Sequence, residues 1–438
     1  MSSPDLAENI HIRRIRLLLW FAAGLTALLG GSWAVFFAWR GDVNIFLVDL
    51  SLLVLGGLVG WLTHKRRTRL AFLVTLGVAY LVIVGMSLFF DVPREDAPRT
   101  SHLYLLVMMM ACTLVLRGES RWLRWGAPAV LGVTFIVFAS TTWGFESEYL
   151  IATSIRRYGG WVHGGIAVIG LMALVHIMLA DVAEANWLEL ELRKGLTRKE
   201  FFLVYQPQVR ADGVVVGAEA LIRWKHPKLG LVPPGQFITA AEDTGLILPI
   251  GEWVLQTACA TLSTWAKTPA LAGLTLSVNV SAKQFLQPSF VQQVADVLAA
   301  NGVPPDRLKV ELTESMLVHD MNDIVQKMHL LHSLGVGCSL DDFGTGFSSL
   351  SYLKKLPLDQ LKIDQSFVRD VLTDPSDAAI ARTVLQLGES LGFSVIAEGV
   401  ETAGQRDFLL AHRCELFQGY LFSRPLSLAD FETYVSHL

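Results

Sequence analysis

The two halves of the sequence differ in how their apolar residues are arranged. In the first half, stretches with little or no charge follow one another at 17–39, 43–63, 70–90, 101–116, 125–143 and 161–180. A helix needs about 20 consecutive apolar residues to cross the ~30 Å hydrocarbon layer of a membrane. We therefore expect residues 1–182 to form a six-helix transmembrane bundle, in which 101–116 is the shortest span.

Basic residues near these spans predict the orientation of the bundle, because Lys and Arg accumulate on the cytoplasmic side of a membrane. Ten flank one side: Arg13, Arg14, Arg16, Lys65, Arg66, Arg67, Arg69, Arg117, Arg121 and Arg124. Five flank the other: Arg40, Arg94, Arg99, Arg156 and Arg157. Both termini are therefore expected in the cytoplasm. The first apolar run is too long for a cleaved signal peptide, so we expect it to be retained.

Three ionisable residues lie within the predicted spans, namely Asp49, His163 and His176. Ionisable groups inside a membrane are often functional. Asp49 is near the end of its span, where a carboxylate can reach the interface. The two histidines are 13 positions apart, which is about 220° around a helix, so they cannot jointly hold one metal or haem. A sensing role and a structural role both stay open.

Small residues recur four positions apart in the first two spans. They are Ala23, Ala27 and Gly31, followed by Gly56 and Gly60. This spacing lets helices pack closely, either within the bundle or between two copies of the chain.

A polar segment at 183–197 follows the last span, and we expect it to be a connecting helix. Leu188, Leu192 and Leu196 form one apolar stripe along it. A continuous helix can transmit motion from the membrane. Packing of the stripe on the following domain explains the pattern equally well.

From 198 to 438, short β-rich runs alternate with helical stretches. The runs are FFLVYQPQV, VVVGAEALIRW, LTLSVNVSA, LKVELTES, GCSLDDFG, LDQLKIDQS, FSVIAEGVE and ELFQGYLF, and the expected helices include 248–265, 289–301, 322–334, 376–391 and 402–412. Eight strands alternating with helices over about 240 residues are typical of an α/β fold of the (β/α)8 barrel type. An open doubly wound sheet is the alternative, but no G-x-G-x-x-G motif favours it. The short 209–215 connection, with its ADG turn, indicates an antiparallel first strand.

Composition and charge add exclusions. The chain is 52% hydrophobic and 17% charged, with a net charge of −4 and four scattered cysteines. This charge gives no support for a DNA partner. Cysteines without a C-x-x-C pair suit reduced thiols in a cytoplasm better than a disulfide framework or a zinc site.

Acidic and amide side chains recur near the ends of the predicted strands. They are Glu219, Asn279, Glu311, Glu314, Asp341, Asp342, Asp364, Glu398 and Glu401, together with Lys362. The carboxyl ends of barrel strands converge on one mouth, where so many carboxylates would repel each other without cations. Oxygen ligands favour Mg²⁺ or Mn²⁺, and two such ions suit attack of water on a phosphodiester. Lys362 would add positive charge beside that water, although a plain salt bridge also explains it.

With these residues in hand, the segment from about 195 to 438 resembles the EAL domain, the family of cyclic di-GMP phosphodiesterases. The motifs are YQPQV (205–209), EALIRW (219–224), SVNVSA (277–282), ELTES (311–315), DDFGTGFSSL (341–350), LKID (361–364), AEGVET (397–402) and FQGYLFSRP (417–425). An isolated E-A-L would carry no information, whereas this combination is specific.

The resemblance implies a role for each of these residues. Glu219, Asn279, Glu311 and Asp341 would hold a first Mg²⁺ or Mn²⁺, and Asp341, Asp342 and Glu398 a second. Lys362 would orient or deprotonate the attacking water, acting with Glu398 and Glu219 as the catalytic group. Gln206, Leu221 and Arg223 would contact cyclic di-GMP. Glu314 and Glu401 would position the loop 344–350, and Gln418 would support the metal ligands from behind.

The loop 344–350 is expected to be mobile, because Gly344 and Gly346 lie in it. Phe347 of this loop stands where relatives often have Tyr. The family also implies a homodimer formed through the EAL domain.

The leading hypothesis is a hydrolase that cleaves cyclic di-GMP to linear pGpG under control of the membrane half. The alternative is an inactive receptor that binds the dinucleotide. A transporter would need polar or broken spans, which these are not.

Overall fold

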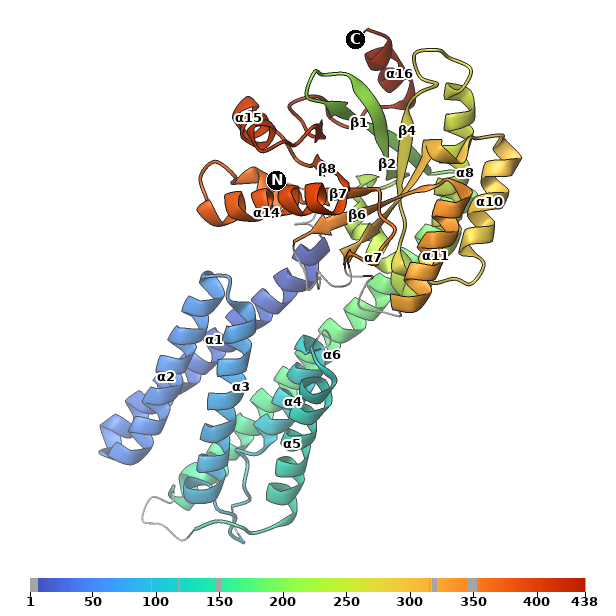
Figure 1. Ribbon diagram of the computed structural model, residues 1–438. Coiled ribbons are helices and arrows are strands. Elements are labelled where there is room, and N and C mark those ends of the chain that lie inside the picture. The colour runs from blue at the N-terminus through green and yellow to red at the C-terminus, as the bar shows by residue number, and fades with distance from the viewer. Residues whose placement is uncertain are drawn as a thin grey trace. The chain divides into compact units, whose positions relative to one another are not determined.

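The computed structural model describes residues 7–95, 97–116, 119–145, 151–314, 316, 321–344 and 353–437. It divides into two compact units, Met1–Asn186 (unit 1) and Trp187–Leu438 (unit 2) (Figure 1). Unit 1 is helical, and unit 2 contains the strands. The two units are described separately below.

Unit 1 consists of long apolar helices. They are α1 (Ala7–Arg40), α2 (Val43–His64), α3 (Thr68–Gly85) continued by the π-helical turn η2 (Met86–Phe90), α4 (Leu103–Val115), α5 (Arg121–Ser140) and α6 (Thr153–Thr197). Five segments are long and apolar enough to cross a membrane: Ile15–Arg40, Val43–His64, Thr68–Phe90, Arg121–Ser140 and Thr153–Ala180. The sixth apolar helix, Leu103–Val115, is shorter at 13 residues.

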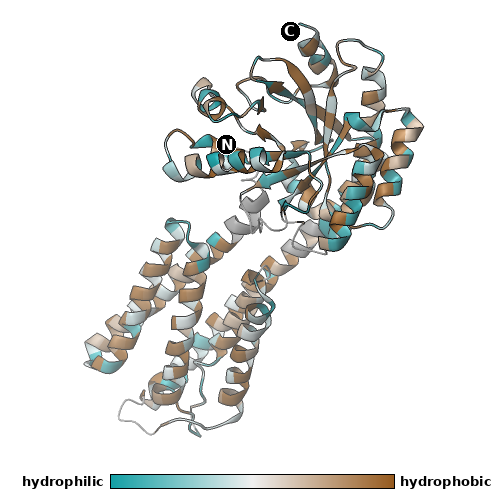
Figure 2. Cartoon of the chain, viewed as in Figure 1, coloured by the Kyte–Doolittle hydropathy of each residue, from teal (hydrophilic) through white to brown (hydrophobic). Residues whose placement is uncertain are grey.

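The helices of unit 1 consist mostly of hydrophobic residues (Figure 2). Large apolar side chains stand exposed along its helices, including Leu81, Ile136 and Ile169. Trp39, Trp122 and other tryptophans are exposed near helix ends, where aromatic side chains line membrane interfaces. A water-soluble protein does not expose this much contiguous apolar surface, so these faces suit lipid.

The small residues of the first two spans serve packing within the chain. A Cβ on Gly56 would lie 2.7 Å from the carbonyl oxygen of Ala23, and one on Gly30 would lie 2.6 Å from that of Asp49. The backbones of α1 and α2 therefore approach each other closely. The side chain of Asp49 is itself buried, with only 6% exposed. Our expectation that it reaches the membrane interface is wrong, because α2 turns this residue towards the interior.

A buried polar cluster organises the connection between η2 and α4. Arg156 Nε lies 3.1 Å from Asp91 Oδ1, and Asp91 Oδ2 accepts from the backbone nitrogens of Thr100 and Ser101. Arg99 donates to three carbonyl oxygens, those of Asp91, Phe138 and Trp143. Buried charges need such partners. The cluster fixes a non-helical segment between apolar helices by satisfying its backbone.

Unit 2 is built on a closed barrel. Its strands are β1 (Phe201–Arg210), β2 (Val215–His226), β3 (Gly230–Val232), β4 (Thr275–Asn279), β5 (Leu308–Thr313), β6 (Gly337–Phe343), β7 (Gln360–Ile363), β8 (Ser394–Ala397) and β9 (Leu416–Phe417). The order is β1-β9-β8-β7-β6-β5-β4-β2-β3, and an additional β1–β2 pairing closes eight strands into a mixed barrel. β1 runs antiparallel to both β2 and β9, and β3 extends β2 as a hairpin.

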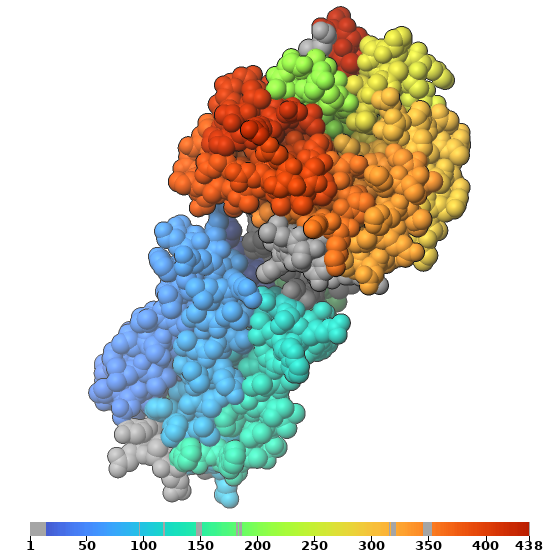
Figure 3. Space-filling model, viewed as in Figure 1, coloured from blue at the N-terminus to red at the C-terminus, as the bar shows by residue number. Residues whose placement is uncertain are grey.

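Helices lie around this barrel (Figure 1), and the yellow to red segments that contain many of them cover the face of unit 2 seen in Figure 3. They are α7 (Pro234–Thr244), α8 (Ile247–Trp265), α9 (Ala282–Phe285), α10 (Phe290–Asn301), α11 (Met321–Leu334), α13 (Gln365–Arg369), α14 (Pro375–Leu391), α15 (Ala403–Ala411) and α16 (Leu428–Ser436), with a 3-10 turn, η3, at Pro305–Arg307. The five expected helices are present within a residue or two of their predicted ends. We did not anticipate α7, α9, α13, α16 and the strand β3.

Alternation along the strands separates an apolar layer from a polar one. Leu276, Val278 and Val310 belong to the apolar core. The intervening positions belong to the other face of each strand, because side chains alternate with a period of two. These positions carry Ser277, Asn279, Lys309, Glu311, Ser339, Asp341, Gln360 and Lys362. The barrel interior is therefore polar, whereas branched aliphatic side chains fill most barrels.

The last residues of α6, from Trp187 on, belong to unit 2. Leu192 is fully buried in the barrel core, and Leu188 and Leu196 pack against it. Glu191 Oε2 lies 3.1 Å from Nε2 of His226, a buried residue of β2. The apolar stripe thus packs on the barrel, as one of the two interpretations of the sequence predicts.

The close approach of α1 and α2 gives a test. Val at position 56 would place its Cβ against backbone atoms of α1, and such overpacking costs about 1–3 kcal/mol. We expect Gly56→Val to lower the thermal unfolding midpoint of the full chain in detergent. Gly57→Val is the control, because nothing lies within 4 Å of its Cβ position. Equal midpoints for the two variants would contradict this packing.

Candidate active site

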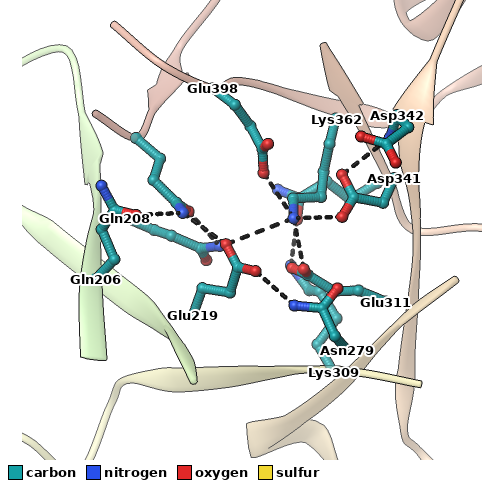
Figure 4. Close-up of polar contacts among 12 residues, drawn as sticks. Gln206, Gln208, Glu219, Asn279, Lys309, Glu311, Asp341, Asp342, Lys362 and Glu398 are labelled. Carbon is teal, nitrogen blue, oxygen red and sulfur yellow. Dashed lines mark hydrogen bonds and ion pairs between the residues drawn. The ribbon is translucent and has the colours of Figure 1, made fainter. Parts of the chain in front are cut away.

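The predicted site residues meet at the carboxyl ends of the parallel strands (Figure 4). Glu219 comes from β2, Asn279 from the end of β4, Glu311 from β5, Asp341 and Asp342 from β6, Lys362 from β7 and Glu398 from the position after β8. We call this end of the barrel the mouth. Residues spread over 180 positions of sequence converge there because parallel strands share one direction.

Lys362 lies at the centre of this cluster and is fully buried. Its Nζ is 2.5 Å from Glu311 Oε2, 2.6 Å from Glu398 Oε1, 3.2 Å from Asp341 Oδ2 and 3.6 Å from Glu219 Oε2. One ammonium group thus faces four carboxylates. If all of them were ionised, three negative charges would stay uncompensated inside the barrel.

A network of amides holds Glu219 in place. Asn279 Nδ2 donates to its Oε1 over 2.6 Å, and Gln418 Nε2 donates to its Oε2 over 2.6 Å. Gln418 also contacts Gln206 Oε1 at 3.2 Å and accepts from Gln208 Nε2 at 3.1 Å. Sequence reasoning missed Gln208. The available signal was its position two residues after Gln206, which places both side chains on one face of β1.

The two adjacent aspartates lie on a β-bulge. The pairing of β6 with β7 shifts register between Leu340 and Phe343. Asp342 has a φ of 56°, in the left-handed region that non-glycine residues seldom adopt, and its backbone nitrogen donates to Asp341 Oδ1 at 2.9 Å. Bulges redirect side chains, and strained backbone of this kind concentrates at functional sites. The bulge lets neighbouring carboxylates serve one site.

The ionisation of the cluster reflects its surplus of acid groups. Burial, reinforced by Glu219 and Asp341 and opposed by Lys362, raises the pKa of Glu311 to about 8. Burial and the other carboxylates raise the pKa of Glu398 well above its usual value. Burial and Asp341 raise that of Asp342 to about 6. Without cations, Glu311 and Glu398 therefore retain protons near neutral pH, whereas Asp342 takes up a proton only as the pH falls to about 6.

Glu219 and Lys362 shift towards their charged forms. Burial opposes the charge on Glu219, but Lys362, Gln418 and Asn279 outweigh it and lower its pKa. Burial likewise opposes the charge on Lys362, yet the carboxylates around it, led by Glu219 and Glu311, raise its pKa well above the usual value. The pair is an ion pair within a cluster of partly protonated acids.

The donor atoms fit a hard divalent cation. They are carboxylate oxygens and one amide oxygen, the ligands that Mg²⁺ and Mn²⁺ prefer. Oε1 of Glu311 is buried and accepts no hydrogen bond from the described residues. No three His, Cys, Asp or Glu side chains in the described part of the chain already form a metal cage. The carboxylates instead contact Nζ of Lys362. Divalent cations bound here would displace the protons that Glu311 and Glu398 hold.

The expected substrate contacts lie near this cluster. Leu221 and Arg223 follow Glu219 at intervals of two on β2, so they share its face and lie successively nearer the end of the strand. Gln206 is paired with Glu219 across the β1–β2 ladder and donates to the carbonyl oxygen of Ser423. The three residues therefore border the mouth on the side of β1 and β2.

The loop after Asp342 is only partly described. The backbone nitrogen of Gly344 donates to Glu314 Oε2 at 3.2 Å, which brings Glu314 to the start of the loop. Positions 345–350, including Gly346 and Phe347, lie outside the described residues. Glu401 is exposed, and its backbone nitrogen donates to Gln405 Oε1 at 2.8 Å. Its role in positioning the loop stays a prediction.

Unit 2 is a mixed eight-stranded barrel with an acidic mouth around one lysine. Comparison with known sequences identifies the family that has this barrel. The profile of the EAL domain matches residues 189–425, more than half of the chain. The chain belongs to the EAL domain family.

Two curated relatives come from Pseudomonas aeruginosa. The bifunctional diguanylate cyclase/cyclic di-GMP phosphodiesterase MucR is 43% identical over 250 residues, covering 57% of this chain and 36% of MucR. The cyclic di-GMP phosphodiesterase NbdA is 42% identical over 262 residues, covering 59% of this chain and 33% of NbdA. The chain thus spans about a third of the length of these relatives.

A solved structure matches the same part of the chain. The MucR phosphodiesterase in complex with cyclic di-GMP aligns with a TM-score of 0.55 and 42% identity. The alignment covers 56% of this chain and 99% of that structure. This alignment therefore compares the barrel unit and not the apolar helices of unit 1.

The raised pKa of Glu311 predicts how stability depends on pH. The folded chain holds a proton on Glu311 up to about pH 8, whereas the unfolded chain releases it near 4.5. This contribution to stability is therefore fully present below the unfolded pKa and lost as the pH rises through about 8. In chelator, the unfolding midpoint should fall between pH 6 and 8.5, and Glu311→Gln should flatten that fall. Parallel curves for the two proteins would contradict the assignment.

Proposed function

We propose that this chain is a membrane-anchored phosphodiesterase that hydrolyses cyclic di-GMP to linear pGpG and so lowers the level of this messenger. The observation that carries the proposal is the cluster of Glu219, Glu311, Asp341 and Glu398 around Lys362 at one barrel mouth. The names of MucR and NbdA, and the cyclic di-GMP in the MucR phosphodiesterase structure, support this substrate.

Two Mg²⁺ or Mn²⁺ ions would complete the site. Glu219, Asn279, Glu311 and Asp341 would hold the first, and Asp341, Asp342 and Glu398 the second. Such ions supply Lewis-acid activation of water and neutralise charge on phosphoryl oxygens. The bulge at Asp341–Asp342 supports this assignment, because it lets consecutive residues face two neighbouring positions.

The chain's own groups would orient the reaction. Water attacks the phosphorus, the bond to one ribose 3′ oxygen breaks, and a proton passes to that oxygen, which leaves linear pGpG. Lys362, as an ammonium group, can donate to the attacking water or to phosphoryl oxygens. Glu219 is fixed by two amides, so its carboxylate needs no reorganisation during the reaction.

The border of the mouth would bind the dinucleotide. Arg223 presents a guanidinium, whose planar fork matches phosphate oxygens. Leu221 offers an apolar contact for a base, and the amide of Gln206 offers hydrogen bonds. All three lie beside Glu219, as the pairing of β1 with β2 places them. Glu314 and Glu401 would position the loop after Asp342, and Gln418 would hold Glu219.

The first half of the chain would anchor the enzyme in a bacterial inner membrane by six spans, with both termini in the cytoplasm. Five helices are long enough by themselves. At about 1.5 Å per residue, the 13 residues of α4 cover roughly 20 Å, so its flanks must contribute to the crossing. We place the membrane region at 1–182, the connecting helix at 183–197 and the EAL domain at 198–438, and expect a homodimer through the last.

We further propose that the membrane region regulates the barrel through α6. The inner face of β2 carries Glu219, Leu221 and Arg223, and the other face carries Trp224 and His226. Glu191 of α6 contacts His226, and a Cβ on Gly195 would lie 3.0 Å from Nε1 of Trp224. A displacement of α6 therefore acts on the strand that bears site residues.

The alternative is an inactive receptor for cyclic di-GMP. Loss of a metal-binding carboxylate or of the lysine would favour it, whereas this chain retains Glu219, Asn279, Glu311, Asp341, Asp342, Lys362 and Glu398. Incubation of the full chain in nanodiscs with Mn²⁺ and cyclic di-GMP separates the two hypotheses. Linear product supports the hydrolase, and tight binding without turnover supports the receptor.

Removal of one carboxylate tests the site. Glu219→Gln keeps the size of the side chain but removes its charge, so we expect turnover of cyclic di-GMP to fall at least about 100-fold. Chromatography of the linear product measures this. Glu252→Gln is the control, because Glu252 is an exposed residue of α8. Full activity of Glu219→Gln would overturn the assignment.

A second pair of variants tests the contact of α6 with β2. Glu191→Ala leaves the buried Nε2 of His226 without its partner, a loss that costs about 1–3 kcal/mol. We expect slower turnover by the full chain, because β2 loses part of its support. Glu189→Ala removes only an ion pair with Arg193, whose side chain is 58% exposed, and should keep normal turnover. Equal rates for both variants would refute this coupling.

A further inference from the structure

A cavity of about 670 Å³ lies within unit 1, apart from the barrel. Residues of α1, α2, α3, α4 and α6 line it, and most of them are apolar. This volume is in the range of pockets that bind small molecules. Its lining is polar at one end and mostly apolar at the other, and this difference indicates which kind of molecule can bind.

The polar residues of the cavity gather towards one end of the bundle, where α1 ends and α2, α4 and α6 begin. Asp49 is six residues from the start of α2, Tyr104 one from the start of α4 and His163 ten from the start of α6. At about 1.5 Å per residue, all three lie within roughly 15 Å of this end. Towards the other end the lining includes Leu17, Leu18, Phe21, Ala111 and Val115, with Thr75 and His176 the exceptions. The cavity is therefore amphipathic along its length.

Asp49 lacks the partner that its position requires. Its side chain is only 6% exposed, and its Oδ2 is buried without a hydrogen bond from the described residues. A lone carboxyl group in apolar surroundings is unfavourable unless something bonds to it. Because Asp49 lines the cavity, a molecule bound there can supply that bond.

Tyr104 and His163 form a second polar group in the same lining. The hydroxyl of Tyr104 lies 2.9 Å from Nδ1 of His163, and either tautomer of the ring allows this bond. The ring of His163 is nearly parallel to that of Trp33, at 15° with centroids 6.1 Å apart. Together they offer hydrogen bonds beside a flat aromatic wall.

The remaining charged groups of the lining are already paired. Arg156 is the only Lys or Arg among the described residues that line the cavity. It bonds to Asp91 Oδ1 and to the carbonyl oxygen of Ala97, and Asp91 Oδ2 accepts from two backbone nitrogens. Among the described residues that line the cavity, no Lys or Arg is left free to hold a phosphate or carboxylate head group.

We propose that this cavity binds an uncharged, membrane-soluble amphiphile. Its hydrogen-bonding head lies at Asp49 and the Tyr104–His163 pair, and its apolar chain lies along α1, α3 and α4. An isoprenoid quinone and a long-chain alcohol share this chemistry. His163 belongs to α6, which continues to Thr197, so the bound molecule contacts the same helix that reaches the barrel core.

Photolabelling of the full chain in nanodiscs tests the proposal. Two probes are used, a decyl benzoquinone and hexadecanol, each carrying a diazirine in the apolar chain. We expect one of them to label α1, α3 or α4 at cavity residues, and the unlabelled compound to compete. Labelling restricted to exposed residues such as Val54 and Val133, or labelling without competition, overturns the proposal.

Variants of Asp49 identify the head-group contact. Asp49→Leu should weaken competition by about tenfold, the effect of losing one buried hydrogen bond. Asp49→Asn keeps hydrogen bonding without charge and should stay within about threefold of the parent. Ser51→Leu, on the exposed side of α2, is the control. An equal loss in Asp49→Asn and Asp49→Leu would refute an uncharged head group.

A cavity-filling variant tests the proposal independently, in case the Asp49 variants fail to fold. Ala173→Phe adds volume on α6 ten residues after His163 and leaves Asp49, Tyr104 and His163 unchanged, and Ala173 lines the cavity. We expect it to abolish competed labelling while the thermal midpoint and the elution volume stay unchanged. Persistent labelling in a folded Ala173→Phe protein overturns the proposal. This readout is binding, so it is independent of whether the barrel hydrolyses cyclic di-GMP.

Discussion

The ammonium group of Lys362 holds the mouth of the barrel together. Four carboxylates, from β2, β5, β6 and the residue after β8, lie within 3.6 Å of it. The single positive charge of Lys362 cannot neutralise four negative charges. The protein resolves this with protons on Glu311 and Glu398, whose pKa values are raised. The same imbalance makes the site receptive to divalent cations. The excess of negative charge in this cluster is therefore what suits it to bind metal ions.

This charge cluster stands on a polar barrel interior. Below the mouth, Lys309 bonds to Gln360 Oε1 at 2.9 Å, and the hydroxyl groups of Ser277 and Ser339 are buried without partners among the described residues. Hydrogen-bonded buried groups specify one arrangement of side chains. The apolar layer between strands and helices stabilises the fold by packing. The barrel interior can therefore hold polar and charged side chains.

Much of this could be predicted from the sequence, because the strong signals were local. Long apolar runs predicted the helices of unit 1, and side chains at strand ends predicted the cluster around Lys362. Features that depend on tertiary contacts were missed. The burial of Asp49 follows from how α2 faces α1, and the bulge at Asp342 follows from pairing with β7. Gln208 gains its role only when β9 brings Gln418 beside it.

The reversed direction of β1 has a consequence for how the chain enters the barrel. In an all-parallel barrel the first strand begins at the closed bottom, opposite the reactive end. Here Phe201 pairs with Trp224, near the end of β2, so the polypeptide arrives at the end of the barrel that carries the acidic mouth. Only three residues separate that point from the end of α6. One inverted strand therefore brings the helix that precedes it directly to the end of the barrel where the carboxylates gather around Lys362.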